Sequence, residues 1–393
     1  MVFSSKARIA LVILSIFSVV LLNRAMVYID LAAFILIINA IAFRHVKVDK
    51  FVASLVVILL SFFIYSTIVT MIYGFQEVIW PMKFFRTAAV VFLLYYLFIN
   101  IKGVMSYEMF QWVIIYIVAF HSVLIYLLIS SGELRDMVYG FTGYTPRGPG
   151  WSRSPGVTQS YNATTIVHLA ALFLLVRLES STLVKRLLFL AIILPSLFFL
   201  GRTMTYIGIM LILLVLAKKE PIKAMLISIG IISLVTLIME MEFESDSTMS
   251  HIAFNISHAV EPVMLIGSET GVDNYASSVL SKHVYFSDDI EVLLFGNSMS
   301  GHMGVLSAKE GETDSDIGVI NSINANGIFI TLFMYLTYAY FIYASRRGDW
   351  QSVSFIAVLC VVLTMKETGF FTSHATPLLL LLVYYQRSIS KET

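Results

Sequence analysis

Long runs of apolar residues separated by short polar segments dominate this chain of 393 residues. A helix that crosses a bilayer needs about 20 predominantly apolar residues, and we find twelve candidate runs, several of them short. This pattern predicts an all-α, polytopic integral membrane protein in which residues 1–393 form one transmembrane helical domain. The predicted spans are residues 9–22, 26–43, 51–73, 84–100, 107–130, 158–176, 187–201, 203–217, 222–240, 317–345, 352–366 and 375–386.

Two polar segments are much longer than the others. Residues 131–157 follow the fifth predicted span and contain a stretch rich in glycine and proline. Residues 241–316 separate the ninth span from the tenth and are rich in Asp and Glu. Within this second segment, residues 250–267 carry apolar side chains at helical spacing, which is typical of a short helix on a membrane surface. We expect this large loop to belong to the same domain as the spans.

The composition supports a membrane protein and narrows the chemistry. Hydrophobic residues make up 58% of the chain and charged residues 13%, whereas a soluble domain is about a quarter charged. The mean hydropathy is +0.86. A single cysteine, Cys360, lies inside an apolar run, which excludes a disulfide framework and a cysteine metal site.

The distribution of Lys and Arg predicts the orientation of the chain. With the N-terminus in the cytoplasm, 16 of the 26 Lys and Arg residues fall in cytoplasmic segments, as the excess of positive charge in short inner loops requires. Both termini are then cytoplasmic, and both long polar segments lie on the outer side of the membrane.

Basic residues on the outer side are informative because the charge bias opposes them. Ionisable side chains at membrane depth are costly and usually functional, and a guanidinium binds phosphate oxygens through two parallel hydrogen bonds. We predict a cationic cradle for a diphosphate, with Arg202 as its strongest member because it sits in a tight turn between two spans. The alternative is that each cation anchors a helix end at the interface or pairs with a local acid. The six candidates are Lys83, Arg86, Arg147, Arg153, Arg202 and Lys366.

Other polar residues carry weaker signals. His121 and His168 lie within predicted spans, where a packed, hydrogen-bonded histidine is expected more often than a ligand. Asp30 is an isolated acid in the second span, where it could be a proton site. The histidines of the large loop, among them His302, lack the spacing of metal ligands, and the chain has no glycine-rich phosphate loop. We therefore predict neither a metal nor a cofactor.

Four stretches, in this order, resemble the O-antigen polymerase and O-antigen ligase superfamily of bacterial membrane glycosyltransferases. The resemblance covers about residues 150–393. Residues 153–175 resemble the family's Arg-x-x-Gly segment, which enters a helix, and residues 201–214 resemble its Gly-Arg-Thr turn. Residues 292–301 and 315–329 resemble the segments at the end of the family's large loop.

The last of these stretches distinguishes the two branches of the superfamily. Ligases usually carry a His eleven residues before a Gly, and this chain has Asp316 at that distance from Gly327. Asp-Ile-Gly resembles the polymerase form, as does the sequence MKETGFF near the end of the chain. The resemblance implies that Asp316 accepts or orients a hydroxyl proton, although it could also cap the tenth span. Asn321 and Asn324 would bind sugar hydroxyls or bond neighbouring helices.

The resemblance implies a metal-independent glycosyltransferase of the bacterial inner membrane, with its active site facing the periplasm. Its substrates would be polyprenyl-diphosphate-linked oligosaccharide repeat units, polymerised into an O-antigen, capsule or exopolysaccharide, with a chain-length regulator as a possible partner and no nucleic acid. His302 would join the outer cations and asparagines in substrate binding. Two alternatives remain open, a ligase on the same fold and a flippase of lipid-linked oligosaccharides. A transporter usually has two related halves, and the single large outer loop argues against that symmetry.

Overall fold

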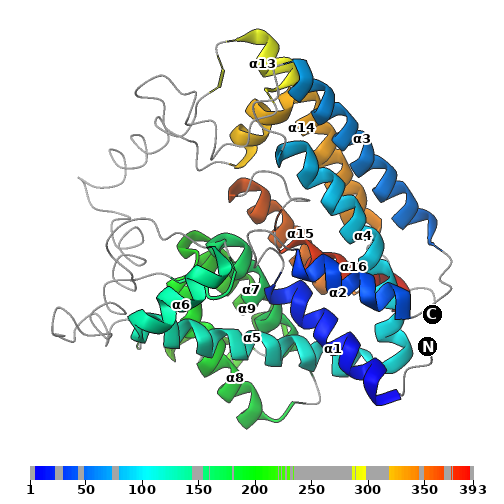
Figure 1. Cartoon of the computed structure of the whole chain (residues 1–393). Coiled ribbons are helices and arrows are strands. Elements are labelled where there is room, and N and C mark those ends of the chain that lie inside the picture. The colour runs from blue at the N-terminus through cyan, green and yellow to red at the C-terminus, as the bar shows by residue number, and fades with distance from the viewer. Residues whose placement is uncertain are drawn as a thin grey trace, which may run out of the picture. The chain divides into compact units, whose positions relative to one another are not determined.

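A computed structural model describes the helical parts of the chain (Figure 1). The described residues are 5–22, 30–42, 48–72, 79–143, 154–158, 160–178, 181–219, 221–222, 224–225, 228–230, 233, 286–287, 289–297, 318–344, 349–366, 373 and 375–389. Within these ranges the only regular elements are helices. They are α1 (Ser5–Leu21), α2 (Leu31–Ala42), α3 (Lys50–Ile72), α4 (Ile79–Val104), α5 (Tyr107–Ser130), α6 (Gly132–Thr142), α7 (Tyr161–Arg177), α8 (Leu183–Ser196), the 3-10 turn η1 (Leu197–Phe199), α9 (Arg202–Lys219), α13 (Ile290–Phe295), α14 (Gly318–Ala344), α15 (Trp350–Lys366) and α16 (Thr376–Ile389).

Four of the described helices are long and apolar enough to cross a membrane. They lie at Lys50–Ile72, Pro81–Val104, Tyr107–Ser130 and Gly318–Tyr343. Shorter apolar helices lie at Leu31–Ala42, Tyr161–Arg177 and Gln351–Val361. The protein is therefore an all-α membrane protein, as the hydrophobic pattern predicts.

The boundaries of the long helices agree with the apolar pattern, but the structure also contains two short helices and a break within α14. The helix α5 begins and ends at the predicted residues because Ser106 caps its first turn, accepting a hydrogen bond from the backbone N–H of Met109. The short helix α6 is not predicted, and neither is the break in α14 at Gly327, whose φ of 76° is not helical. The helix α13 lies in the loop 241–316, where the sequence predicts short surface helices but does not indicate this position. Most of the predicted span 222–240 and the predicted surface helix at 250–267 lie outside the described residues.

The chain forms two compact units, each assembled from separate stretches of sequence. Unit 1 consists of Met1–Ile35 and Ile101–Glu269, and unit 2 consists of Leu36–Asn100 and Thr270–Thr393. Most helices belong wholly to one unit, whereas α2 and α4 each contribute to both.

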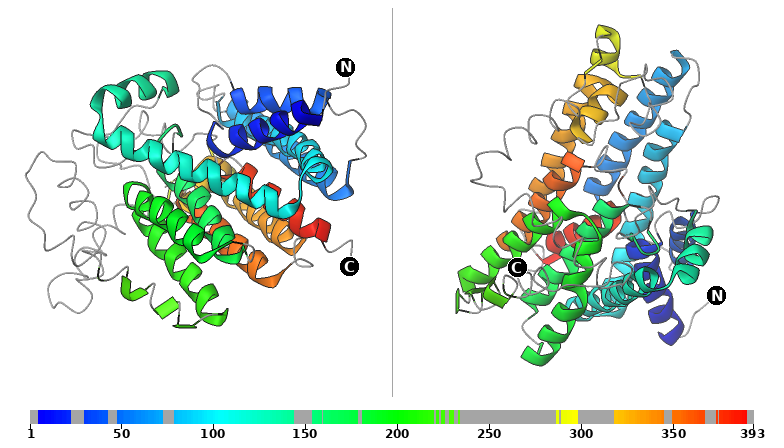
Figure 2. Two further views of the ribbon diagram at one scale, coloured as in Figure 1. Left: turned by 90° about the horizontal axis from the view of Figure 1, so that it is seen from below. Right: turned by 90° about the vertical axis from the view of Figure 1, so that its left-hand side faces the viewer.

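The centre of unit 1 is α7, which is buried over almost its whole length. Every residue from Ala163 to Leu175 is buried, because α5, α8 and α9 pack around this helix and α1 packs against α5 (Figures 1 and 2). A helix that is apolar on all sides is expected at the centre of a bundle. The seventh helix therefore anchors the segments at both of its ends.

Cations and aromatic rings gather at the C-terminal end of α7. The ring of Trp112 lies 5.7 Å from that of Phe189, and the ammonium of Lys185 lies 5.8 Å from the Trp112 ring centroid. The guanidinium of Arg186 donates to Ser181 Oγ at 2.6 Å and also to the carbonyl of Leu178. These are cations that the charge bias assigns to the cytoplasmic side, and aromatic rings beside them are typical of a membrane interface.

Unit 2 is held together by aromatic contacts between helices that lie far apart in the sequence. In Figure 1, α3 and α4 run beside α14, and Phe62 of α3 lies 5.7 Å from Phe84 of α4 and 5.5 Å from Phe333 of α14. The ring of Phe98 in α4 lies 5.2 Å from that of Tyr385 in α16. Each such pair adds about 0.5–1.5 kcal/mol to the effect of burial alone.

One end of unit 2 is closed by polar contacts between the start of α3 and the end of α16. Arg387 lies 3.6 Å from the carboxylate of Asp49, and its guanidinium stacks 4.1 Å from the Phe51 ring centroid. The side chain of Gln386 accepts the backbone N–H of Asp349 at 3.1 Å. The helices α3 and α15 both begin at the end of unit 2 where α16 ends. They therefore start at the side where α16 finishes, which is the order of directions predicted for these spans.

Candidate functional site

The predicted Arg-x-x-Gly segment enters the described structure as a buried turn, residues 154–158, directly before α7. Ser154 is fully buried, and its hydroxyl accepts hydrogen bonds from the Tyr139 hydroxyl at 2.9 Å and from the Gly156 backbone N–H at 3.2 Å. The hydroxyl of Thr158 donates to the carbonyl of Pro155 at 2.8 Å and also bonds Thr164 in α7. We call this segment the 154–158 turn.

Gly156 is required at the centre of the 154–158 turn for two reasons. Its φ is 67°, a left-handed conformation that residues with a Cβ rarely adopt. A Cβ at this position would also overlap with the imidazole ring of His121 in α5. The turn and the histidine therefore fit together only because position 156 has no side chain.

His121 begins a buried chain of hydrogen bonds through unit 1. Its Nε2 accepts the backbone N–H of Val157 at 3.2 Å, and its Nδ1 lies 3.0 Å from Nε2 of His168 in α7. His168 Nδ1 in turn lies 2.9 Å from the hydroxyl of Ser196, which bonds Ile193 O at 2.7 Å. Both histidines are fully buried. The prediction that they are packed, hydrogen-bonded residues is confirmed.

The predicted Gly-Arg-Thr turn lies between η1 and α9 and is held by α7. The backbone N–H of Gly201 donates to the hydroxyl of Thr165 at 2.8 Å, and Thr165 is fully buried. At the start of α9, the hydroxyl of Thr205 donates a hydrogen bond to Gly201 O at 2.8 Å. Arg202 is therefore the first residue of α9, as the tight turn between two spans requires.

The 154–158 turn and the start of α9 lie side by side. The backbone N–H of Ser154 donates to the carbonyl of Phe199 at 3.2 Å. Arg153 lies outside the described residues but precedes Ser154 directly, and the side chain of Arg202 also lies outside the description. Two stretches that the sequence singles out separately, near residues 153 and 202, thus meet at one end of unit 1.

Two helix N-termini meet at this end of unit 1. The first residue of α7 follows Ser160, whose hydroxyl accepts the backbone N–H of Ala163 at 3.2 Å, and α9 starts at Arg202. Each helix N-terminus carries about half a positive charge, and backbone N–H groups at helix N-termini can bind anions. Together with a guanidinium, the two termini suit a multiply charged anion such as a diphosphate.

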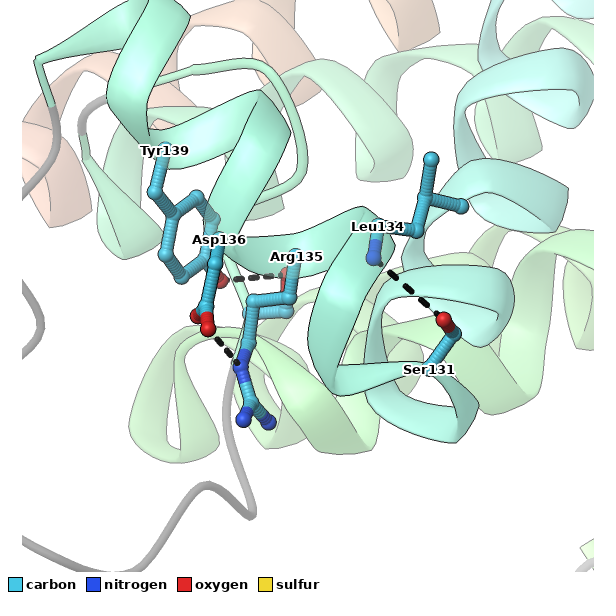
Figure 3. A network of polar contacts seen from close by, with 6 residues as sticks. Ser131, Leu134, Arg135, Asp136 and Tyr139 are labelled. Atoms are coloured by element: carbon cyan, nitrogen blue, oxygen red, sulfur yellow. Dashed lines mark hydrogen bonds and ion pairs between the residues drawn. The ribbon is translucent and has the colours of Figure 1, made fainter.

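The unpredicted helix α6 supports the 154–158 turn from the other side. Ser131 ends α5 and begins α6 without a linker, because its hydroxyl accepts the backbone N–H of Leu134 at 3.3 Å (Figure 3). The half-buried Arg135 forms an ion pair of 3.8 Å with the exposed Asp136. On the buried side, burial raises the pKa of Tyr139 to about 12, so its hydroxyl remains a donor to the turn at neutral pH.

In unit 2 the two other motifs, residues 292–301 and 315–329, also meet. The backbone N–H of Asn297 donates to the carbonyl of Asn324 at 3.0 Å. Gly296 and Gly327 have φ values of 77° and 76°, and a Cβ on either would overlap with backbone of the facing segment. The hydroxyl of Tyr65 in α3 bonds Phe295 O at 2.7 Å. We call this contact of α13 with the break in α14 the glycine joint.

The asparagines of α14 have different environments. Asn326 is buried and its amide donates to Ser322 O at 3.1 Å, which also accepts the hydroxyl of Thr331 at 2.9 Å across the break. Asn326 thus stabilises the broken helix itself. Asn321 is buried and Asn324 is half-buried in the same half of α14, and their role in sugar binding remains a prediction.

The remaining predicted residues divide into those described in part and those outside the described ranges. Lys83 and Arg86 are half-buried on one face of α4, which begins at Ile79, so they lie within the helix rather than at its start. Lys366 is the last residue of α15. The predicted site residues outside the described ranges are Arg147, Arg153, His302 and Asp316.

Asp30 differs from the prediction. Its carboxylate accepts the backbone N–H of Ala33 at 3.0 Å, and α2 begins only at Leu31. Asp30 therefore caps the start of α2 rather than lying inside the helix, because a carboxylate can accept N–H groups of a first helical turn. The proton site stays a prediction.

Sequence reasoning missed several residues that build the site. Thr165 and Ser154 give no local signal, because a buried hydroxyl between distant backbone segments has no characteristic spacing. The helix α6, in contrast, has a local sequence signal. Ser131 is followed by Glu133 in the first turn, a pattern typical of a helix start.

No protein-family model, curated protein or solved structure matches the chain. The site must therefore be interpreted from its own residues. The described part of the chain contains no group of three or more His, Cys, Asp or Glu side chains arranged to hold a metal ion. What it does contain is the meeting of the 154–158 turn with the segment that precedes α9 in unit 1, and the glycine joint in unit 2.

Proposed function

We propose that this protein is a membrane glycosyltransferase that polymerises polyprenyl-diphosphate-linked oligosaccharide repeat units into a bacterial surface polysaccharide. The observation that carries the proposal is the meeting of the 154–158 turn with the start of α9 through Ser154 and Phe199. This contact joins the segments that follow Arg153 and precede Arg202, beside two helix N-termini. An end built in this way favours a diphosphate, which is the leaving group of such a reaction.

The proposed chemical step is a displacement at the anomeric carbon of the donor. A hydroxyl of the acceptor repeat unit attacks this carbon, the bond to the diphosphate breaks, and the lipid diphosphate leaves with the electron pair. Arg202 and Arg153 stabilise the negative charge of the leaving group, and the resemblance of the sequence adds Lys366 to them. Asp316 takes the proton of the attacking hydroxyl. The donor bond supplies the free energy, so the reaction consumes no nucleotide.

The proposal includes twelve spans in the inner membrane, with both termini cytoplasmic and residues 241–316 in the periplasm. In unit 1, the aromatic and cationic end at Trp112 and Lys185 would face the cytoplasm, and the 154–158 turn the periplasm. We expect a reporter enzyme that folds only outside the cytoplasm to be active when it is fused after Ser250. The matched control is a fusion after Lys219, which should be inactive. Reversed activities would overturn the orientation and the proposed site.

The products in cells lacking the protein test the function directly. Loss of a polymerase leaves single repeat units on the final acceptor, loss of a ligase leaves polymer on its lipid diphosphate, and loss of a flippase leaves no product outside. We expect single repeats, and a ladder of chain lengths once the protein is restored. The purified protein in lipid vesicles should extend lipid-linked repeats without nucleotide sugars and release one lipid diphosphate for each new linkage. Vesicles that only translocate the substrate would contradict the proposal.

A further inference from the structure

We propose that His121 is a positioning residue that holds the 154–158 turn against the start of α9 and thereby sets the affinity for the donor's diphosphate. The inference rests on the proposed function, because the diphosphate is the anion that this end of unit 1 would bind. His121 lies within α5, and its contact with the turn is made through Val157. Nothing in its sequence position alone distinguishes it from an ordinary buried histidine.

The donors and acceptors along the buried chain can be arranged in only one direction. A backbone N–H can only donate, so Nε2 of His121 must accept from Val157 and its proton must lie on Nδ1. This Nδ1–H donates to Nε2 of His168, whose own proton then lies on Nδ1 and is donated to Ser196. The hydroxyl of Ser196 donates to Ile193 O. Each polar atom in the chain is satisfied.

This direction requires both imidazoles to be neutral. A proton on Nε2 of His121 would face the N–H of Val157, and a proton on Nε2 of His168 would face the Nδ1–H of His121. The chain also begins at a backbone N–H and ends at a backbone carbonyl, so it offers a proton no entry and no exit. It therefore does not act as a proton relay. Its effect is to fix the ring of His121 at one orientation.

The fixed ring determines the position of the turn through two contacts. It accepts the N–H of Val157, and its edge fills the space beside Gly156 that a Cβ would occupy. The same turn donates from Ser154 to Phe199 O, two residues before Gly201. A displacement of the ring would therefore be passed through the turn to the segment that begins α9. His121 acts at the site through the backbone and does not touch the substrate.

Three variants separate this role from general packing. The His121→Leu variant fills a similar volume but can neither accept from Val157 nor donate to His168. The His121→Gln variant keeps one acceptor and one donor on its amide. The Ser122→Ala variant is the matched control, because Ser122 is the next residue of α5 and bonds Ser196 at the far end of the chain, 3.1 Å away. The Ser122→Ala variant leaves the hydrogen bond between His121 and Val157 intact.

The first readout is kinetic and uses a lipid-linked oligomer as the donor and single lipid-linked repeat units as the acceptor. We expect His121→Leu to raise KM for the donor about tenfold or more while KM for the acceptor stays within twofold, since only the site for the donor's diphosphate is affected. His121→Gln should restore most of the donor affinity, and Ser122→Ala should match the wild type. A wild-type donor KM in His121→Leu, at equal amounts of folded protein, overturns the inference.

The second readout is independent of activity. Cys360 is the only cysteine and is buried, so Val157→Cys in a Cys360→Ala background gives a single probe on the half-buried turn. We expect its labelling by a maleimide to be severalfold faster with His121→Leu, and unchanged with Ser122→Ala. Equal labelling rates overturn the inference even if activity falls. If labelling changes but the wild-type protein extends no repeat units, the proposed function fails and the attachment of the turn to His121 stands.

Discussion

Replacing Asp316 by asparagine should leave a protein that inserts, folds and binds its donor but does not extend a chain beyond one repeat. As a cap of α14, an aspartate contributes about 1 kcal/mol and asparagine replaces it well. As a proton acceptor it must be a carboxylate, and general-base catalysis contributes about 10² to 10⁴ in rate. The two roles therefore predict results that differ by orders of magnitude. Chain-length distributions at matched protein levels provide the measurement.

Donor binding serves as the internal control for the Asp316→Asn variant. Its retention would show that the outer cations are unaffected, because no positive charge has been changed. Asp316→Glu would add a second comparison, since it keeps the carboxylate but moves it. Near-normal polymer from Asp316→Asn would remove Asp316 from the mechanism. The base would then have to be sought at Glu312, Asp314 or His302.

The second large effect is expected at Arg202, the first residue of α9. If its guanidinium binds the diphosphate through two hydrogen bonds, Arg202→Lys should be nearly as defective as Arg202→Ala, because an ammonium cannot reproduce the paired geometry. Losing such a contact in the transition state costs about 2–4 kcal/mol, or roughly a hundredfold or more in rate. Initial rates of linkage formation in vesicles would measure the loss.

Arg177 provides the matched control for Arg202. It is the last residue of α7, at the opposite end of unit 1, and its guanidinium lies 5.6 Å from the Phe173 ring centroid. We expect Arg177→Lys to retain activity within about twofold, because Arg177 lies at the opposite end of unit 1 from the proposed diphosphate site and lysine keeps its positive charge. Wild-type chain lengths in Arg202→Lys would mean that Arg202 only anchors its helix at the membrane interface.

The four long apolar helices could be predicted from the sequence because apolarity is a local property of each run. The helix α5 shows this well, since its apolar run is bounded by Ser106 and Ser131, which both cap helices. The Gly-Arg-Thr turn was predicted between two spans for the same reason. Loops that join adjacent helices are likewise encoded within a few residues of the turn itself.

Contacts between distant segments could not be predicted in this way. Nothing near Gly327 indicates that its backbone must leave the helical conformation, because the cause is α13, which approaches it from another part of the chain. Likewise, His121 and His168 each read as an isolated polar residue within a span. Their pairing depends on how α5 packs against α7, and a single sequence carries no record of that contact.

The glycine joint has a consequence for the segment of residues 298–317 that connects α13 to α14. The segment begins just after Gly296, which packs against α14, and it ends where α14 begins at Gly318, nine residues before Gly327, which packs against α13. The entropy of closing a loop grows only with the logarithm of its length, about 0.6 kcal/mol for each doubling. Insertions and deletions here should therefore be inexpensive, and evolution can vary the length of the segment freely. The position of Asp316 would not change with such insertions, because Asp316 stays two residues before the start of α14 whatever the length of the preceding segment.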